Sequence, residues 1–380
     1  MSGSLAGART LQDEIASVHE CLKRQLPLVE RIAVALYDPV RDTLKTFVNS
    51  TDGGSPIAHY EVTLESTPSL KAIALSGRPR VLDEMRELEG SPSEHTRLLL
   101  QKGYRSSYTL PVFEDGQLFG FLFFDASVPG YFDPQVVEHL DVFARLLSLS
   151  LSQAFSETRL LESALRVVTR LTHYRDPETR GHLDRMAQYS RIVAKGVAAA
   201  SGLSDEYVES ILRFSPLHDI GKIAVPDSIL LKQSALTPSE FAVMQTHATK
   251  GAEIIEGIVR EMDLGSVIHI DMLRNVVLFH HESMDGSGYP HGRRGAEIPF
   301  EARIVKVADV FDALTSRRPY KDAWSIDEAL AFMTTRSGNL FDGDCVAALV
   351  AGRNEAAAVV SSVVDASDSE QSHEGYSLEL

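Results

Sequence analysis

Residues 280–290 read HHESMDGSGYP and place two adjacent histidines in front of a carboxylate, a glycine-rich turn and a proline. Neighbouring side chains on an α-helix point about 100° apart, because the helix has about 3.6 residues per turn. His280 and His281 therefore cannot easily reach one ion from one direction, whereas each can reach one of two ions. The same holds for His218 and Asp219 in the stretch HDIGK. These pairs predict a site for more than one metal ion in a helical domain.

Further histidines and carboxylates recur through the same half of the chain. Glu178 and His182 are four residues apart and share one helix face, and His247 and Asp309 lie in other apolar helical stretches. One buried histidine is readily explained by a hydrogen bond to a carbonyl group. The whole set favours a metal site, because buried ionisable groups are costly unless they are paired or bound to metal. Nitrogen and oxygen ligands without thiolate favour Fe or Mn, with Zn as the alternative.

The composition narrows the class of protein. Of 380 residues, 44% are hydrophobic and 24% charged, as in globular proteins, and no apolar run approaches the ~18 residues that would span a bilayer. The N-terminus lacks the apolar segment of a signal peptide, and the two cysteines, Cys21 and Cys345, lie far apart. We therefore expect a cytoplasmic protein without membrane association. The net charge of −16 argues against binding to a nucleic-acid polymer.

The N-terminal third alternates helical and strand-like segments. Two strand–turn–strand patterns, each with a short polar turn, predict β-hairpins. The expected elements are a helix at 11–26, hairpins at 31–50 and 106–127, and helices at 70–75 and 94–102. Residues 1–134 are thus predicted to form an α+β domain on an antiparallel sheet. The order of elements resembles a GAF sensor domain, and no cysteine or histidine constellation in it indicates which ligand it would sense.

Residues 135–170 carry the clearest helical periodicity of the chain and predict a long linker helix. Its apolar stripe alternates spacings of four and three residues. The stripe consists of Leu140, Ala144, Leu147, Leu151, Ala154, Thr158, Leu161, Leu165 and Val168. Two interpretations are open: a coiled-coil seam that makes a parallel homodimer, or an amphipathic helix that packs on its own domain.

The remainder of the chain is predicted to be an all-α bundle over residues 160–350, followed by an acidic, disordered tail at 351–380. The stretches HDIGK, HHESMDGSGYP and ADVFDALTSRRPY occur there in this order. This combination resembles the HD-GYP family of cyclic di-GMP phosphodiesterases, over about half of the chain. The resemblance implies a multidomain protein: a GAF-like sensor, a linker helix and an HD-GYP helical bundle.

The resemblance also implies a centre of two or three divalent metal ions. Carried over by motif, the ligands are Glu178, His182, His218, Asp219, His247, His280, His281 and Asp309. In this family the position of Glu178 accompanies a third metal. A hydroxide held by the metals would open cyclic di-GMP to linear pGpG, which some members cleave on to GMP. Metal pairs about 3.5–4 Å apart are a known device for phosphodiester hydrolysis.

The family pattern assigns the remaining site residues. Asp219 and Lys222 would be catalytic, with Lys222 near the scissile phosphate. Tyr289, Gly288 and Pro290 would form a loop beside the substrate; the alternatives are a structural turn with Tyr289 packed inward and a docking surface for partner proteins. The phosphate-binding residues would be Arg318 and Lys321, with a solvated helix end as the alternative.

Other functions remain open on the sequence alone. A non-hydrolytic cyclic-dinucleotide receptor would lose metal ligands or the GYP turn, and this chain keeps both. A hydrolase of mixed cyclic GMP–AMP would need the same metal and phosphate residues. A general HD phosphohydrolase of mononucleotides would not need the GYP segment.

Overall fold

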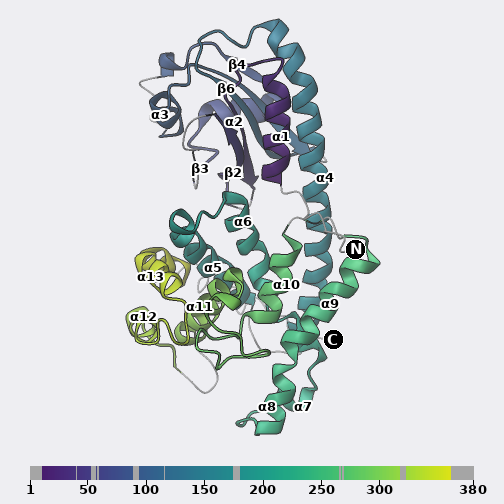
Figure 1. The fold of residues 1–380 in the computed structure, drawn as a ribbon, viewed down its shortest axis with the longest axis vertical. Coiled ribbons are helices and arrows are strands. Elements are labelled where there is room, and N and C mark those ends of the chain that lie inside the picture. Colours follow the sequence, from purple (N-terminus) through teal and green to yellow (C-terminus); the bar gives the residue numbers. More distant parts are fainter. Residues whose placement is uncertain are drawn as a thin grey trace, which may run out of the picture. The chain divides into compact units, whose positions relative to one another are not determined.

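The computed structural model describes residues 11–39, 41–52, 57, 60–88, 94–114, 116–173, 180–264, 267, 269–316 and 322–360. The chain divides into two compact units, of which the first reaches Glu157 and the second begins at Thr158. Residues 204–206 are grouped with the first unit. The boundary falls inside α4 (Pro134–His173), the long helix that Figure 1 labels.

The first unit is built on an antiparallel sheet, as the two hairpin patterns predicted, and two short strands outside the hairpins bring the sheet to six strands. The strand order is β3-β2-β1-β6-β5-β4. The strands are β1 (Arg31–Asp38), β2 (Thr43–Thr51), β3 (Glu61–Thr63), β4 (Arg80–Leu82), β5 (Ser106–Glu114) and β6 (Gln117–Ala126). The hairpins β1–β2 and β5–β6 meet in the middle of the sheet, where Ile32 of β1 lies opposite Phe124 of β6.

Helices cover the sheet, which buries its apolar side chains. The helical segments of this unit are α1 (Leu11–Lys23), α2 (Pro68–Ser76), η1 (Met85–Leu88), α3 (Glu94–Gln101) and the first part of α4. Ile73 of α2 belongs to the same buried cluster as Phe121 and Phe123 of β6. The ring of Phe155 of α4 packs against that of Phe47 of β2 in a tilted arrangement, with ring centroids 5.2 Å apart. The fold is the antiparallel α+β arrangement that the sequence predicted.

The apolar stripe predicted as a coiled-coil seam is buried against the chain itself. Leu140, Leu147 and Leu151 are at most 2% exposed, and Leu161 and Leu165 belong to the core of the second unit. Of the two interpretations, the amphipathic helix that packs on its own domains is therefore the one the structure supports. A different row of α4 side chains is exposed: Val142, Leu146, Leu149, Leu160 and Val167.

The described part of the second unit is helical, as predicted. Its elements are α5 (Arg180–Ser201), α6 (Asp205–Phe214), η2 (Ser215–Leu217), η3 (Ile220–Ala224), α7 (Asp227–Leu230), α8 (Pro238–Gln245), α9 (His247–Glu261), α10 (Ile270–Phe279), η4 (Gly295–Glu297), α11 (Phe300–Thr315), α12 (Ile326–Thr334) and α13 (Gly343–Ala351). Capping boxes at Thr237 and Ser325 fix the starts of α8 and α12. On α11 the buried Ile304, Ala308 and Phe311 recur every three or four residues, as one core-facing stripe requires.

The packed core extends beyond the boundary drawn at residue 350. Ala356 is fully buried, and Val359 and Val360 pack on the core of the bundle. The segment was assigned to the tail because its alanines and valines lack a long apolar period. In the part of the chain that the structure describes, no helix is both long and apolar enough to cross a membrane.

Candidate metal centre

Five separate segments bring their histidines and aspartates together. His182 lies in the first turn of α5, and His218 and Asp219 occupy the junction between η2 and η3. His247 begins α9, and Asp309 lies on α11. His280 and His281 follow directly after α10. The site is thus assembled at helix ends and junctions of one bundle.

A glycine permits the close approach of two of these segments. A Cβ atom at Gly221, in η3, would lie 1.9 Å from the carbonyl oxygen of His247 and 2.5 Å from the backbone nitrogen of Gly251. Both neighbours are backbone atoms of α9 and cannot rotate away. The glycine of HDIGK therefore sets the distance between Asp219 and His247.

The ligand atoms fall into two groups, within each of which they lie no more than 4.8 Å apart. The first group is Asp219, His247, His280 and His281, and the second is His182, His218 and Asp309. The two oxygens of Asp219 face both groups: Oδ1 lies 3.2 Å from His247 Nε2, and Oδ2 lies 3.3 Å from His218 Nε2. This is the position of a carboxylate that could bridge two ions. Glu178, the remaining predicted ligand, lies outside the described residues.

The two pairs of adjacent residues, His218–Asp219 and His280–His281, are arranged differently. His218 and Asp219 are divided between the two groups, in keeping with the 100° argument. His280 and His281 both belong to the first group, and their ring centroids are only 4.0 Å apart. The expectation that they serve different ions is not met. His280 itself keeps α-helical backbone angles (φ −62°, ψ −15°), so the side-chain rotamers, and not the end of the helix, turn both rings to the same group.

The imidazoles are held so that one nitrogen of each ring is turned into the cluster. The Nδ1 atoms lie within hydrogen-bond distance of carbonyl oxygens: His218 of Ser215 (2.8 Å), His247 of Met244 (2.8 Å) and His280 of Val276 (3.0 Å). Their Nε2 atoms, together with that of His182, are buried and make no hydrogen bond of good geometry with a described residue, although those of His218 and His247 lie 3.3 Å and 3.2 Å from oxygens of Asp219. Buried polar atoms are rarely left unsatisfied. Converging, unpartnered imidazole nitrogens with fixed outer partners fit divalent metal ions.

His182 is oriented by a carboxylate that the sequence analysis did not select. Asp312 is 1% exposed, and its Oδ2 lies 2.7 Å from His182 Nδ1. Arg185 donates to the same carboxylate, from Nε over 2.6 Å and from Nη2 over 3.1 Å. The signal was present in the sequence, since Asp309 and Asp312 are three residues apart and share a helix face. Asp312 is a positioning residue for one side of the site.

The charges around Asp219 keep it ionised. Burial alone would raise its pKa, but Lys222 and His218 outweigh burial and hold the pKa well below its ordinary value. Lys222 Nζ lies 2.9 Å from Asp219 Oδ2. Burial opposes protonation of His218, yet Asp219 and Asp309 raise its pKa to about 9. Without metal, the cluster thus compensates its carboxylates with protons, which divalent ions would displace.

Comparison with known proteins agrees with this geometry. A family model described as HD domain matches residues 141–345, more than half of the chain. The chain belongs to the HD domain family. A second model, described as GAF domain, matches residues 11–151 of this HD domain protein. The resemblance drawn from HDIGK and from the order of N-terminal elements is therefore confirmed.

The relatives of this HD domain protein carry names from cyclic dinucleotide signalling. It is 46% identical over 213 residues to "Cyclic di-GMP phosphodiesterase response regulator RpfG" of Xanthomonas campestris pv. campestris, covering 55% of this chain and 53% of that one. It is 39% identical to a "Cyclic di-GMP phosphodiesterase" of Thermotoga maritima, over 54% and 53% of the two chains. It is 36% identical to "3'3'-cGAMP-specific phosphodiesterase 2" of Vibrio cholerae, over 50% and 34%. The chain thus spans about half the length, or less, of these relatives.

The loop after α10 in the HD domain is closed by a buried carboxylate and a tight glycine. Glu282 is 1% exposed and accepts hydrogen bonds from the backbone nitrogens of His291 (2.7 Å) and Arg293 (3.0 Å). A Cβ atom at Gly288 would lie 2.4 Å from the carbonyl oxygen of His281. The loop folds back so closely on the histidine pair that position 288 must be glycine. The carboxylate of HHE, Glu282, holds the loop in this conformation through its two hydrogen bonds.

A half-buried lysine, Lys306, connects the same loop to α11. Lys306 Nζ donates to the carbonyl oxygen of His281 and to Ser283 Oγ, each over 3.0 Å. Burial lowers the pKa of Lys306 to about 8. Lys306 was not selected from the sequence, because a lysine in an amphipathic helix is normally solvated.

Of the predicted substrate residues, Tyr289 lies beside the cluster. Its ring stacks on that of His281, with centroids 4.5 Å apart, and burial raises the pKa of its phenol. Pro290 follows it in the same loop, half-buried. Arg318 and Lys321 lie outside the described residues.

Proposed function

We propose that this chain is a metal-dependent phosphodiesterase that hydrolyses cyclic di-GMP to pGpG, and on to GMP. The observation that carries the proposal is the convergence of four buried, unpartnered Nε2 atoms around Asp219 and Asp309. The names of relatives at 39–46% identity support the substrate class.

Two or three divalent ions, with Fe or Mn preferred, would be held by the two groups, and Glu178 would accompany a third. When bound, such ions activate water and neutralise phosphate charge. Lys222 would stabilise charge that develops on the phosphate or the leaving oxygen, since its ammonium group already lies at the edge of the cluster. Tyr289, with Gly288 and Pro290 shaping its loop, would line the substrate side. Arg318 and Lys321 would bind phosphate.

A second candidate substrate is 3'3'-cGAMP, which the names of several relatives support. Several relatives are named as specific for 3'3'-cGAMP, with identities of 30–36%. The residues described above would contact metal and phosphate, which are common to both dinucleotides, and so do not distinguish guanine from adenine. We propose cyclic di-GMP as the preferred substrate because the relative at 46% identity carries that name. A non-hydrolytic receptor is the less favoured alternative, because every described ligand position is in place.

The test is anaerobic purification, metal analysis and incubation with each cyclic dinucleotide, followed by separation of products. We expect pGpG or GMP from cyclic di-GMP, and loss of product in Asp219→Asn with the fold retained by circular dichroism. Asp271→Asn is the matched control, because its carboxylate is exposed and pairs with Arg274. Full metal content with intact substrate would refute hydrolysis, and faster turnover of mixed cyclic GMP–AMP would change the substrate.

We further propose that the protein forms a homodimer through the exposed row of α4. Val142, Leu146 and Leu149 are more than half exposed and spaced by four and three residues, as at a coiled-coil seam. Substitution of Leu146 by Glu should shift the molar mass measured by light scattering from dimer to monomer.

The GAF domain would regulate the enzyme. The two free cysteines agree with a reducing, cytoplasmic location.

A further inference from the structure

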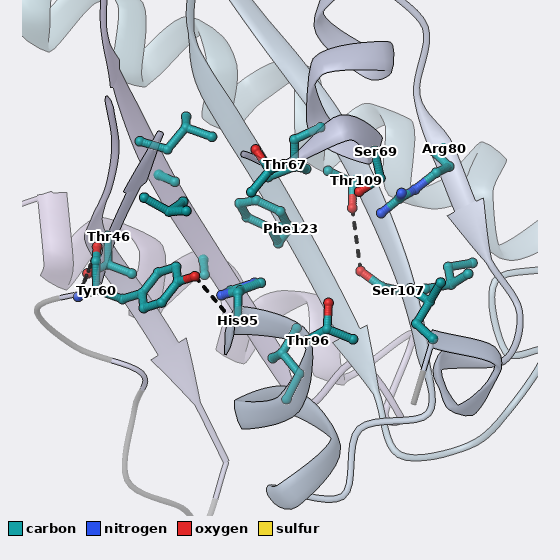
Figure 2. Close-up of a pocket in the computed structure, with 18 of the residues that line it drawn as sticks. Thr46, Tyr60, Thr67, Ser69, Arg80, His95, Thr96, Ser107, Thr109 and Phe123 are labelled. Atoms are coloured by element: carbon teal, nitrogen blue, oxygen red, sulfur yellow. Dashed lines mark hydrogen bonds between the residues drawn. The ribbon is translucent and has the colours of Figure 1, made fainter. Parts of the chain in front are cut away.

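The N-terminal domain encloses a cavity of about 290 Å³ between its sheet and the helices α2 and α3 (Figure 2). Strands β1, β2, β5 and β6 provide one wall, and β4, η1 and α3 help to close the other. Small-molecule sites commonly have volumes of about 300–1,000 Å³, so this cavity is at the small end of that range. It is suited to one compact ligand.

Three of the residues that line the cavity are cationic, namely Arg31, Lys45 and Arg80, and none of the described lining residues is Asp or Glu. Arg31 is already neutralised, because it forms a buried ion pair with Asp125. Among the described residues, Arg80 has no ion-pair partner.

Arg80 is the lining residue best suited to bind an anion. Its Nε atom is buried and makes no hydrogen bond, and burial lowers its pKa. In Figure 2 it extends from β4 toward Ser69 and Thr109, whose hydroxyl groups lie on the same side of the cavity. A half-buried cation whose Nε lacks a hydrogen bond is unfavourable, and a guanidinium group matches the two oxygens of a carboxylate. The guanidinium group and these hydroxyl groups thus offer hydrogen-bond donors to an oxyanion.

The rest of the cavity suits an apolar or aromatic body. Phe123 lies in the middle of the wall formed by the sheet (Figure 2), and Leu99 and Met85 add apolar surface from α3 and η1. The ring of His95 lies 5.8 Å from that of Phe123, and its buried Nε2 makes no hydrogen bond. His95 thus offers one further polar contact at a distance from Arg80.

We propose that this cavity binds a small organic carboxylate, with its carboxylate group on Arg80 and its apolar or aromatic body against Phe123. The domain would thus respond to a small organic acid whose negative charge compensates the positive charge of Arg80. This inference concerns the N-terminal domain and does not depend on the reaction of the HD domain.

The test is calorimetric titration of the full chain with hexanoate, benzoate, phenylacetate and indole-3-acetate, each beside its neutral amide. We expect at least one acid to bind, and its amide to bind about tenfold more weakly or not at all, because a charge-assisted pair is lost. Arg80→Gln should abolish the difference, and Arg80→Lys should restore part of it. Arg78→Gln is the matched control, because Arg78 is exposed two residues away.

Four outcomes would overturn the proposal. They are binding by none of the acids, equal binding of an acid and its amide, unchanged binding by Arg80→Gln, and tighter binding of phenyl phosphate than of every acid. The last would identify a phosphate site. Thermal unfolding of each variant without ligand separates lost binding from lost folding.

Discussion

Gly221→Ala tests how the metal centre is assembled. The added Cβ atom would lie 1.9 Å from the carbonyl oxygen of His247, although contacts under 3.0 Å are essentially never observed. The segments η3 and α9 must therefore separate by about 1 Å, and overpacking of this kind costs about 1–3 kcal/mol. For a domain of this size the unfolding temperature would fall by roughly 2–12 °C.

The same movement would separate Asp219 from His247, whose ligand atoms are now 3.2 Å apart. We expect metal affinity to fall by about 10–100-fold, the usual effect of disturbing the support of a ligand. Metal titration and calorimetric unfolding measure the two effects on one sample. Gly257→Ala is the control: its Cβ atom would meet nothing within 4 Å, and alanine favours a helix by about 0.5–1 kcal/mol. Wild-type metal affinity and stability in Gly221→Ala would refute the assembly described above.

Three further predictions rest on specific contacts. Asp312→Asn should weaken metal binding about 10–100-fold because it releases His182, whereas Asp327→Asn, at an exposed ion pair with Arg353, should leave metal binding unchanged. Equal metal affinities of the two variants in a titration would contradict this prediction. Burial lowers the pKa of His95 to about 3, so below about pH 6.5 the unfolded chain binds a proton that the folded chain excludes. The free energy of unfolding of the N-terminal unit should therefore fall as the pH drops, by at most about 1.4 kcal/mol per pH unit, and this fall should be smaller in His95→Phe. Asp125→Ala should cost about 3–5 kcal/mol in urea unfolding because it strands the buried Arg31, against at most about 1 kcal/mol for Glu65→Ala at an exposed pair.

Short-range patterns predicted the two hairpins and the long helix, but not the short edge strands β3 and β4. The hairpins around residues 39–42 and 115–116 were visible because strand alternation and turn residues are local properties. The apolar stripe of α4 was visible too, but its partner was not: Leu147 fits a dimer seam and a domain core equally well in sequence. Only the packing shows that the chain itself covers Leu147 and leaves Leu146 exposed.

The site shows the same division between local and long-range information. The motif residues were found because their spacing is specific, and the bundle brings His182 and His218 into one group and His247 into the other. The outer partners were missed because they depend on contacts far apart in sequence, as between His182 and Asp312. The grouping of His281 with His280 was missed because the side-chain rotamers that turn both rings to one group are not readable from the sequence.

The most direct test of the metal centre is elemental analysis of the anaerobically purified chain after loading with iron or manganese. We predict two or more metal ions per chain in the wild type and a clear loss in Asp219→Asn, whose carboxylate faces both histidine groups. One ion or fewer per chain under every loading condition, with the protein folded, would contradict a centre built from the two groups.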